Sequence, residues 1–197
     1  MAAAAIVIAV AVAAALIWWT SDARATISTP AADPLPNLEA ATDVPATLSQ
    51  RWTAPSPKTT MPLVIAGAVV TGDGREVIGH DHSTGAPLWS YARDVDLCGV
   101  TWVYQYAVAV YPDDRGCGQV STIDATTGLR GATRTAYADP EVVLSSDGST
   151  VLSVGDSRLE QWRSDMVRTL SWGALDARLK PDVPQDPLCR LASAEAS

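Results

Sequence analysis

Three cysteines are the residues of this 197-residue chain whose type and spacing most directly suggest chemistry. Cys98 and Cys117 flank two short apolar stretches, residues 100–103 and 107–111, which are typical of β-strands. If these strands form a hairpin, both cysteines lie at the same end of it, and a disulfide can form where their Cα atoms come within about 7 Å. We therefore predict a disulfide, with two reduced thiols or a metal site as the alternatives. Cys189 is left over, and an odd cysteine indicates a missing partner.

The two histidines, His80 and His82, have the spacing that places two side chains on one face of a strand. His82 falls inside a turn sequence, and a metal ion would need further ligands from elsewhere, so we predict a surface turn here. The neighbouring acids Asp113 and Asp114 lie in a polar loop, residues 112–118, which is typical of a solvated loop tip. No combination of serine, histidine and aspartate has a spacing that singles out a nucleophile. We assign no catalytic residue, no metal ligand and no cofactor.

Two turn sequences of the same kind organise the rest of the chain. Each begins with an aspartate, whose side chain can accept hydrogen bonds from backbone N–H groups two residues on, and ends in Thr-Gly, where glycine tolerates a positive φ. The residues concerned are Asp81, Thr84 and Gly85 in the first turn, and Asp124, Thr127 and Gly128 in the second, 43 residues later. A turn repeated at this distance indicates one four-stranded unit per repeat, as in a propeller blade.

A third unit follows with different turns. It contains Asp147 and Gly148 in a Ser-Ser-Asp-Gly turn, and it carries Trp162 where the earlier units have His80 and Ile123. Apolar and β-branched stretches predict the strands of all three units: residues 63–71, 75–80, 88–91, 100–103, 107–111, 119–123, 141–144, 150–154, 158–162 and 167–172. No stretch of ten or more residues after the N-terminal run has helical periodicity, so we expect an all-β domain.

The N-terminal stretch differs in composition from the rest. Residues 2–19 are an unbroken run of 18 apolar residues, about the length that crosses a hydrocarbon core of roughly 30 Å as a helix. Trp18 and Trp19 close the run where an aromatic belt would lie. We therefore expect residues 1–25 to be a transmembrane anchor, with a cleavable signal sequence or a buried core helix as the alternatives.

Residues 26–62 hold seven of the thirteen prolines and are predicted to be an extended spacer. Trp52 within them is expected to pack onto the folded domain, because a lone tryptophan in a solvated linker is unusual. We expect one folded domain, residues 63–175, which is large enough to bury a core. The net charge of −8 and the isoelectric point of about 4.6 leave no basic stripe to replace counterions along phosphates, so we expect no nucleic-acid partner.

Three stretches resemble β-propeller repeats. EVIGHDHSTGAPLWSY (residues 76–91) and QVSTIDATTGLRG (residues 119–131) are similar to the repeat of pyrroloquinoline-quinone-type (PQQ-like) propellers, and Trp89 matches the packing tryptophan of that repeat. SSDGSTVLSVGDSRLEQWR (residues 145–163) is similar to the inner strands of a WD-repeat blade. The resemblance covers about residues 63–172 and implies a partial β-propeller of about three four-stranded antiparallel blades after one N-terminal transmembrane helix. The whole arrangement is similar to envelope proteins of high-GC Gram-positive bacteria.

These features predict a non-enzymatic interaction or scaffold protein of the cell membrane, single-pass, with an extracytoplasmic C-terminal domain and another envelope protein as its partner. The first alternative is a quinone-dependent dehydrogenase-like enzyme, although the Cys-Cys dipeptide and calcium ligands of that family are not visible in the sequence. The second alternative is a sensor of a small envelope ligand.

Propellers typically close with four to eight blades. We therefore expect an incomplete ring, with residues 176–197 as an irregular tail at the start of missing blades. The alternative is a small open β-domain that is complete as it stands.

Overall fold

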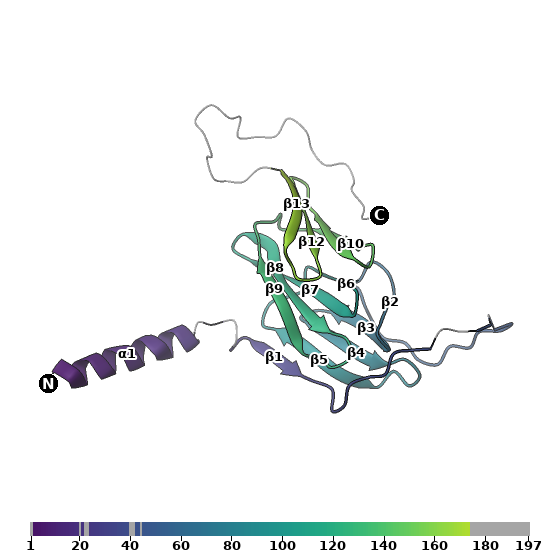
Figure 1. The fold of residues 1–197 in the computed structure, drawn as a ribbon, viewed down its shortest axis with the longest axis horizontal. Coiled ribbons are helices and arrows are strands. Elements are labelled where there is room, and N and C mark those ends of the chain that lie inside the picture. The colour runs from purple at the N-terminus through teal and green to yellow at the C-terminus, as the bar shows by residue number, and fades with distance from the viewer. Residues whose placement is uncertain (1, 20, 22–23, 40–41, 44, 174–197) are drawn as a thin grey trace.

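The computed structural model describes residues 2–19, 21, 24–39, 42–43 and 45–173. Within these residues it contains one helix, α1 (Ala2–Trp19), and thirteen strands arranged in three antiparallel sheets. Figure 1 shows the three sheets gathered in one body, with α1 apart from them. The prediction of a mostly β chain with about three antiparallel units is confirmed. The predicted tail, residues 176–197, and Cys189 lie outside the described residues.

Each sheet is a meander, in which a strand pairs with the next strand along the chain. The first sheet contains β2 (Leu63–Ile65), β3 (Ala68–Asp73), β4 (Glu76–Asp81) and β5 (Pro87–Arg93). The second contains β6 (Gly99–Val103), β7 (Tyr106–Asp113), β8 (Gly116–Asp124) and β9 (Arg130–Thr135). The third contains β10 (Val143–Ser146), β11 (Thr150–Val154), β12 (Arg158–Arg163) and β13 (Arg168–Gly173). A fifth strand of the first sheet, β1 (Thr26–Thr29), comes from the proline-rich stretch and pairs antiparallel with β5.

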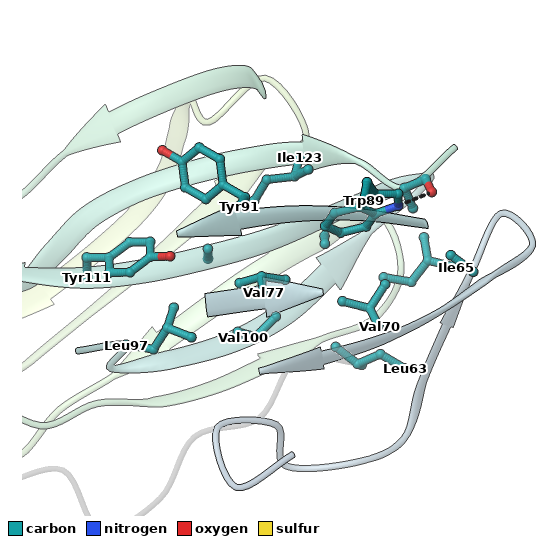
Figure 2. Close-up of a cluster of buried hydrophobic side chains, with 14 residues drawn as sticks. Leu63, Ile65, Val70, Val77, Trp89, Tyr91, Leu97, Val100, Tyr111 and Ile123 are labelled. Carbon is teal, nitrogen blue, oxygen red and sulfur yellow. Dashed lines mark hydrogen bonds between the residues drawn. The ribbon is translucent and has the colours of Figure 1, made fainter. Parts of the chain in front are cut away.

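The centre of the second sheet is buried on both of its faces. One apolar core lies between it and the first sheet and contains Trp89 and Ile123 (Figure 2). The other core lies between the second and third sheets and contains Trp162. Strand β7 supplies both cores, because Ala109 belongs to the first and Val108 to the second. A strand buried on both faces has no polar alternation, which explains the unbroken apolar run at the centre of β7.

Helix α1 does not fit the predicted membrane anchor. Its 18 residues rise by about 27 Å at 1.5 Å per residue, which is less than a hydrocarbon core of about 30 Å, and half of them are alanine. No helix in the described part of the chain is both long and apolar enough to span a bilayer. The prediction of a single-pass protein of the cell membrane, with its C-terminal domain placed outside the cytoplasm by that span, is therefore wrong.

The chain just before β2 lies along the first sheet. Residues 51–58, which we call the strap, alternate between exposed and partly buried side chains, as an extended chain does on a surface. The Gly72 N–H donates to Ser56 Oγ at 3.0 Å, and the Val100 N–H donates to the Lys58 carbonyl at 2.7 Å. The strap therefore connects the first sheet to β6, the first strand of the second sheet.

The two-sided burial of β7 can be tested with Val108→Ala. Because Val108 is fully buried in the second core, we expect the variant to lose about 2 kcal/mol of unfolding free energy from lost transfer energy and a residual cavity. Urea unfolding followed by circular dichroism measures this loss. The control is Val64→Ala on β2, where the valine side chain is exposed and the change should stay within about 0.5 kcal/mol. Equal losses in the two variants would contradict the second core.

Candidate interaction site

The two repeated turns are built in the same way. In the first turn, Asp81 Oδ1 accepts hydrogen bonds from the N–H groups of Ser83 at 3.0 Å and Thr84 at 2.8 Å. In the second, Asp124 Oδ1 accepts the corresponding pair of bonds at 2.9 and 3.1 Å. The hydrogen bonds from Ser83 and Thr84 hold the pKa of Asp81 well below its ordinary value. The Asp-to-Gly sequence thus forms the local structure that its composition indicates.

A tryptophan is packed on the glycine that ends the second turn. Trp89 lies against Gly128, whose φ is 74°, and its Nε1 donates to the Ala125 carbonyl at 2.8 Å. A Cβ at position 128 would overlap the Trp89 side chain, so both the backbone conformation and the space require glycine here. This contact joins the first sheet to the second, as Figure 2 shows for the Trp89 hydrogen bond.

Trp52 of the strap makes the same contact on the first turn. Its ring lies against Gly85, and its Nε1 donates to the His82 carbonyl at 3.1 Å. His82 holds the position in the first turn that Ala125 holds in the second. Trp52 therefore packs on the turn of the first sheet in the same way as Trp89 packs on the turn of the second. The sequence did not indicate this equivalence, because Trp89 lies on a strand and Trp52 on a proline-rich segment.

The turn of the third unit lies between β10 and β11. Asp147 accepts hydrogen bonds from the N–H groups of Thr150 at 2.6 Å and Ser149 at 2.7 Å, and these bonds lower the pKa of Asp147 to about 2. Gly148 has a φ of 89° and lies against Trp102 of the second sheet. A glycine turn under a tryptophan therefore occurs at this interface too, but the tryptophan comes from β6.

The two histidines have different surroundings. His80 is buried: Nδ1 donates to the Gly85 carbonyl at 3.0 Å, and Nε2 accepts from the Thr71 hydroxyl at 2.9 Å. It is thus a satisfied strand residue, and only His82 is exposed in the surface turn that we predicted for both. Across the described ranges, no three or more His, Cys, Asp or Glu side chains are grouped so that they could hold a metal ion.

A hollow of about 320 Å³ lies between the strap and the first sheet. Ala54 and Pro55 of the strap line one side, and Thr71, Glu76 and His80 line the other. Because both ring nitrogens of His80 are already hydrogen-bonded, that side chain offers no free polar group to a ligand. The small-ligand sensor stays a prediction.

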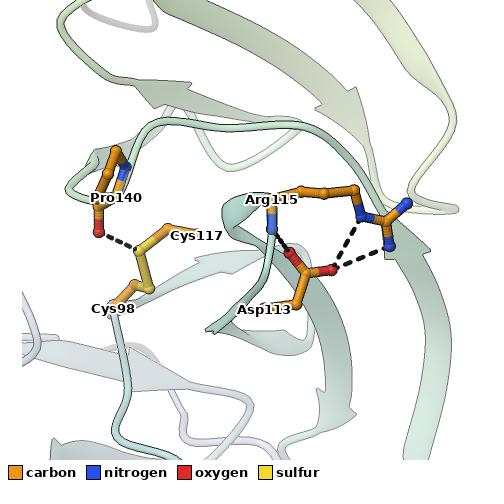
Figure 3. Close-up of a disulfide and its surroundings, with 5 residues drawn as sticks. All are labelled: Cys98, Asp113, Arg115, Cys117 and Pro140. Carbon is orange, nitrogen blue, oxygen red and sulfur yellow. Dashed lines mark hydrogen bonds and ion pairs between the residues drawn. A yellow bond between two sulfur atoms is a disulfide. The ribbon is translucent and has the colours of Figure 1, made fainter. Parts of the chain in front are cut away.

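The predicted disulfide is confirmed. Cys98 and Cys117 are bonded, with their Cα atoms 6.0 Å apart, at the same end of the second sheet (Figure 3). The Cys117 N–H donates to the Asp139 carbonyl at 3.0 Å, and the Pro140 carbonyl oxygen lies 2.9 Å from Cys117 Sγ. The bridge therefore also lies against the connection that leads from the second sheet to the third.

The loop between β7 and β8 is more ordered than the predicted solvated tip. Asp113 accepts a hydrogen bond from the Arg115 N–H at 2.7 Å and pairs with the Arg115 guanidinium at 3.0 Å (Figure 3). It also accepts a hydrogen bond from Gln119 Nε2 at 2.8 Å. Burial alone would raise the pKa of Asp113, but the bonds from Gln119 and Arg115 outweigh it and lower the pKa. Asp114 alone extends into solvent.

A buried carboxylate joins the second and third sheets. Glu160 of β12 accepts hydrogen bonds from Arg134 of β9 at 2.8 and 3.1 Å, from Arg158 at 2.7 Å, from Arg168 of β13 at 3.2 Å and from Trp162 Nε1 at 2.9 Å. Burial alone would raise the pKa of Glu160, but the bonds from Trp162 and Arg158, together with Arg134, lower it below its ordinary value. This cluster was not predicted from the sequence. The alternation of Arg158, Glu160 and Trp162 on one strand face is the signal that could have found it.

The face of the third sheet turned away from the second sheet carries exposed apolar side chains on its edge strands, while Leu152 and Leu159 at its centre are only 6% and 8% exposed. One row of paired residues crosses it from β10 to β13: Val143, Val154, Leu159 and Trp172. Val143 is 64% exposed, Trp172 is 36% exposed, and Leu170 on the same face of β13 is 52% exposed. We call this surface the open face.

The corresponding face of the first sheet is covered. Trp89 pairs with Gly79, two residues before the turn that begins at Asp81, and Leu170 pairs with Gln161, two residues before the turn that begins at Arg163. Leu170 therefore corresponds to Trp89, and Trp172, two residues further along its strand, corresponds to Tyr91. Trp89 and Tyr91 are each only 1% exposed, because the second sheet lies over them. These positions on the last strand are thus buried in the first sheet, which another sheet follows, and exposed in the third sheet, the last one that the structure describes.

No protein-family model matches this chain, and no curated protein is significantly similar to it. The function proposed below therefore depends on the geometry of the chain itself.

The contact between Trp89 and Gly128 predicts that Gly128→Ala is strongly destabilising. We expect a loss of about 3 kcal/mol of unfolding free energy, because the new Cβ overlaps the indole and an alanine backbone is strained at this positive φ. Gly74→Ala is the matched control, since Gly74 also has a positive φ, 50°, but open space around its Cα. Gly74→Ala should lose only about 1 kcal/mol of unfolding free energy. Chemical unfolding measures both, and equal losses would show that the indole contact contributes nothing.

The lowered pKa of Glu160 predicts a pH-dependent contribution to stability. A carboxylate whose native pKa lies below its ordinary value stabilises the fold above that value, and the contribution is lost as the pH falls through the native pKa. We expect Glu160→Gln to cost about 3 kcal/mol of unfolding free energy at pH 7, since it leaves the buried Arg158 and the partly buried Arg134 without their anion. The cost should shrink as the pH falls below 4.5, the ordinary value of a glutamate. Urea unfolding at pH 7, 5 and 3 tests this.

The control for that series is Glu141→Gln, because Glu141 is exposed and should leave the free energy of unfolding nearly unchanged at all three values. A Glu160→Gln cost that is the same at pH 7 and pH 3 would contradict an ionised native Glu160.

Proposed function

We propose that this chain is a non-enzymatic interaction or scaffold module, built as three blades of an incomplete β-propeller of the PQQ-like or WD-repeat type. Three consecutive meanders, each packed on the next, support the propeller assignment. The Trp89–Gly128 contact at the repeated turn supports the resemblance to PQQ-like repeats. An exposed sheet edge and face are features that propellers remove by adding further blades.

The open face carries the proposal. A sheet face with the exposed apolar side chains Val143, Leu170 and Trp172 is of the kind that marks a protein interaction surface. Its occupant is a further antiparallel sheet, because the equivalent positions in the first sheet are buried by a sheet. That sheet comes from a second protein or from a longer form of this chain.

We propose another envelope protein as the partner, because disulfides such as Cys98–Cys117 persist in oxidising environments.

A photo-crosslinking residue at Leu170 tests this proposal in producing cells. We expect a discrete crosslink that maps by peptide analysis to a β-strand of the partner, and its loss when Trp172→Asp is added to the open face. Trp172 is partly exposed, so the substitution should leave the circular dichroism spectrum unchanged. The control places the crosslinker at Thr133, an exposed residue of β9.

Equal crosslinking at positions 133 and 170, or none at 170, would rule out a partner on the open face. The enzyme alternative has a separate readout, because quinone absorbance and bound calcium in the protein purified from its own cells would favour a dehydrogenase-like function over a scaffold.

A further inference from the structure

The cluster around Glu160 holds more positive charge than one carboxylate can neutralise. The guanidinium groups of Arg134, Arg158 and Arg168 all bond to Glu160, so three positive charges share one negative charge. Asp139 also approaches this region, but its carboxylate accepts bonds from Ser157 and from the Arg158 backbone N–H. The chain as a whole has a net charge of −8, which makes a local excess of positive charge unusual for it.

The hydrogen-bonding capacity of Glu160 is fully used. Its Oε2 accepts two bonds from Arg134 and one from Trp162, and its Oε1 accepts one each from Arg158 and Arg168. A carboxylate offers about four lone-pair sites, whereas each guanidinium has five N–H donors. The three arginines therefore keep donors that Glu160 cannot satisfy.

One of these surplus donors is buried. Arg158 Nε has no hydrogen-bond partner, and the Arg158 side chain is only 8% exposed. An unsatisfied donor on a buried charged group costs free energy that a fold normally avoids. An added acceptor in this cluster would remove that cost.

The cluster is also accessible from solvent on one side. Side-chain exposure rises from 8% at Arg158 to 19% at Arg134 and 45% at Arg168. Arg134 lies on β9 and Arg168 on β13, the outer strands of the second and third sheets. The surplus donors thus extend from the buried interface to the outer rim between these two sheets.

We infer that this arginine cluster is a binding site for an oxyanion, a phosphate or a carboxylate group, at the outer rim between the second and third sheets. Guanidinium groups match the oxygens of both anions with paired, charge-assisted hydrogen bonds. The anion enters the site beside Arg168, and Arg158 Nε is the innermost hydrogen-bond donor. The site is separate from the open face, because Glu160 and Trp162 lie on the opposite side of β12 from Leu159.

Isothermal titration calorimetry of the full chain with sodium phosphate, at constant ionic strength set with sodium chloride, tests the inference. We expect saturable binding, and a loss of affinity of about tenfold or more in Arg168→Gln, because a charge-assisted donor is removed. The matched control is Arg163→Gln on the same sheet, where Arg163 is exposed and pairs with the exposed Asp165. This variant should bind as the parent does.

A second titration with sodium acetate separates the two anion sources. Binding of phosphate alone assigns the site to phosphoryl groups, and binding of acetate as well assigns it to carboxylates such as those of acidic peptides. Arg168→Lys provides a further check, since lysine keeps the charge but loses the paired donors and should bind more weakly than arginine. No saturable binding of either anion, or equal affinities in the parent and Arg168→Gln, would overturn the inference.

Discussion

The burial of the second sheet between two apolar cores is the constraint on which the rest of the structure depends. The side chains of β7 from Ala107 to Tyr111 are fully buried, so the centre of this sheet has no face that tolerates water. Both neighbouring sheets must be in place before it is stable, and each neighbour in turn needs a cover for its own second face. The strap partly covers the first sheet, whereas the third sheet presents its open face.

The two interfaces of the second sheet are held by different means. At the first interface a tryptophan of the outer strand is packed on a turn glycine, Trp89 on Gly128. At the second interface Ala132 holds the position that corresponds to Trp89, and the turn between β12 and β13 has no glycine. Glu160 and its arginines make the connection there. At the second interface a buried ion cluster thus accompanies the contact of Trp102 with Gly148, and no tryptophan occupies the position that corresponds to Trp89.

The parts of the structure that could be predicted from the sequence are those determined by neighbouring residues. The turns at Asp81 and Asp124 follow from side chains that bond to their own backbone, and the disulfide follows from two cysteines at the ends of one hairpin. The pairing of β1 with β5, the contact of Trp52 with Gly85 and the Glu160 cluster depend on contacts between distant segments, for which no local pattern exists. The predicted membrane anchor is wrong because an 18-residue helix that is half alanine rises by only about 27 Å, less than a hydrocarbon core of about 30 Å.

The attachment of the N-terminal stretch has a consequence for proteolysis. Strand β1 is held by its four paired residues with β5, and the strap is held by Trp52 and Ser56, while residues 45–50 between them are exposed. Exposed connections of this kind are the preferred sites of protease cleavage. A single cut there would leave two fragments that stay associated without a covalent link, so the protein would migrate as one species in its native state and as two after denaturation.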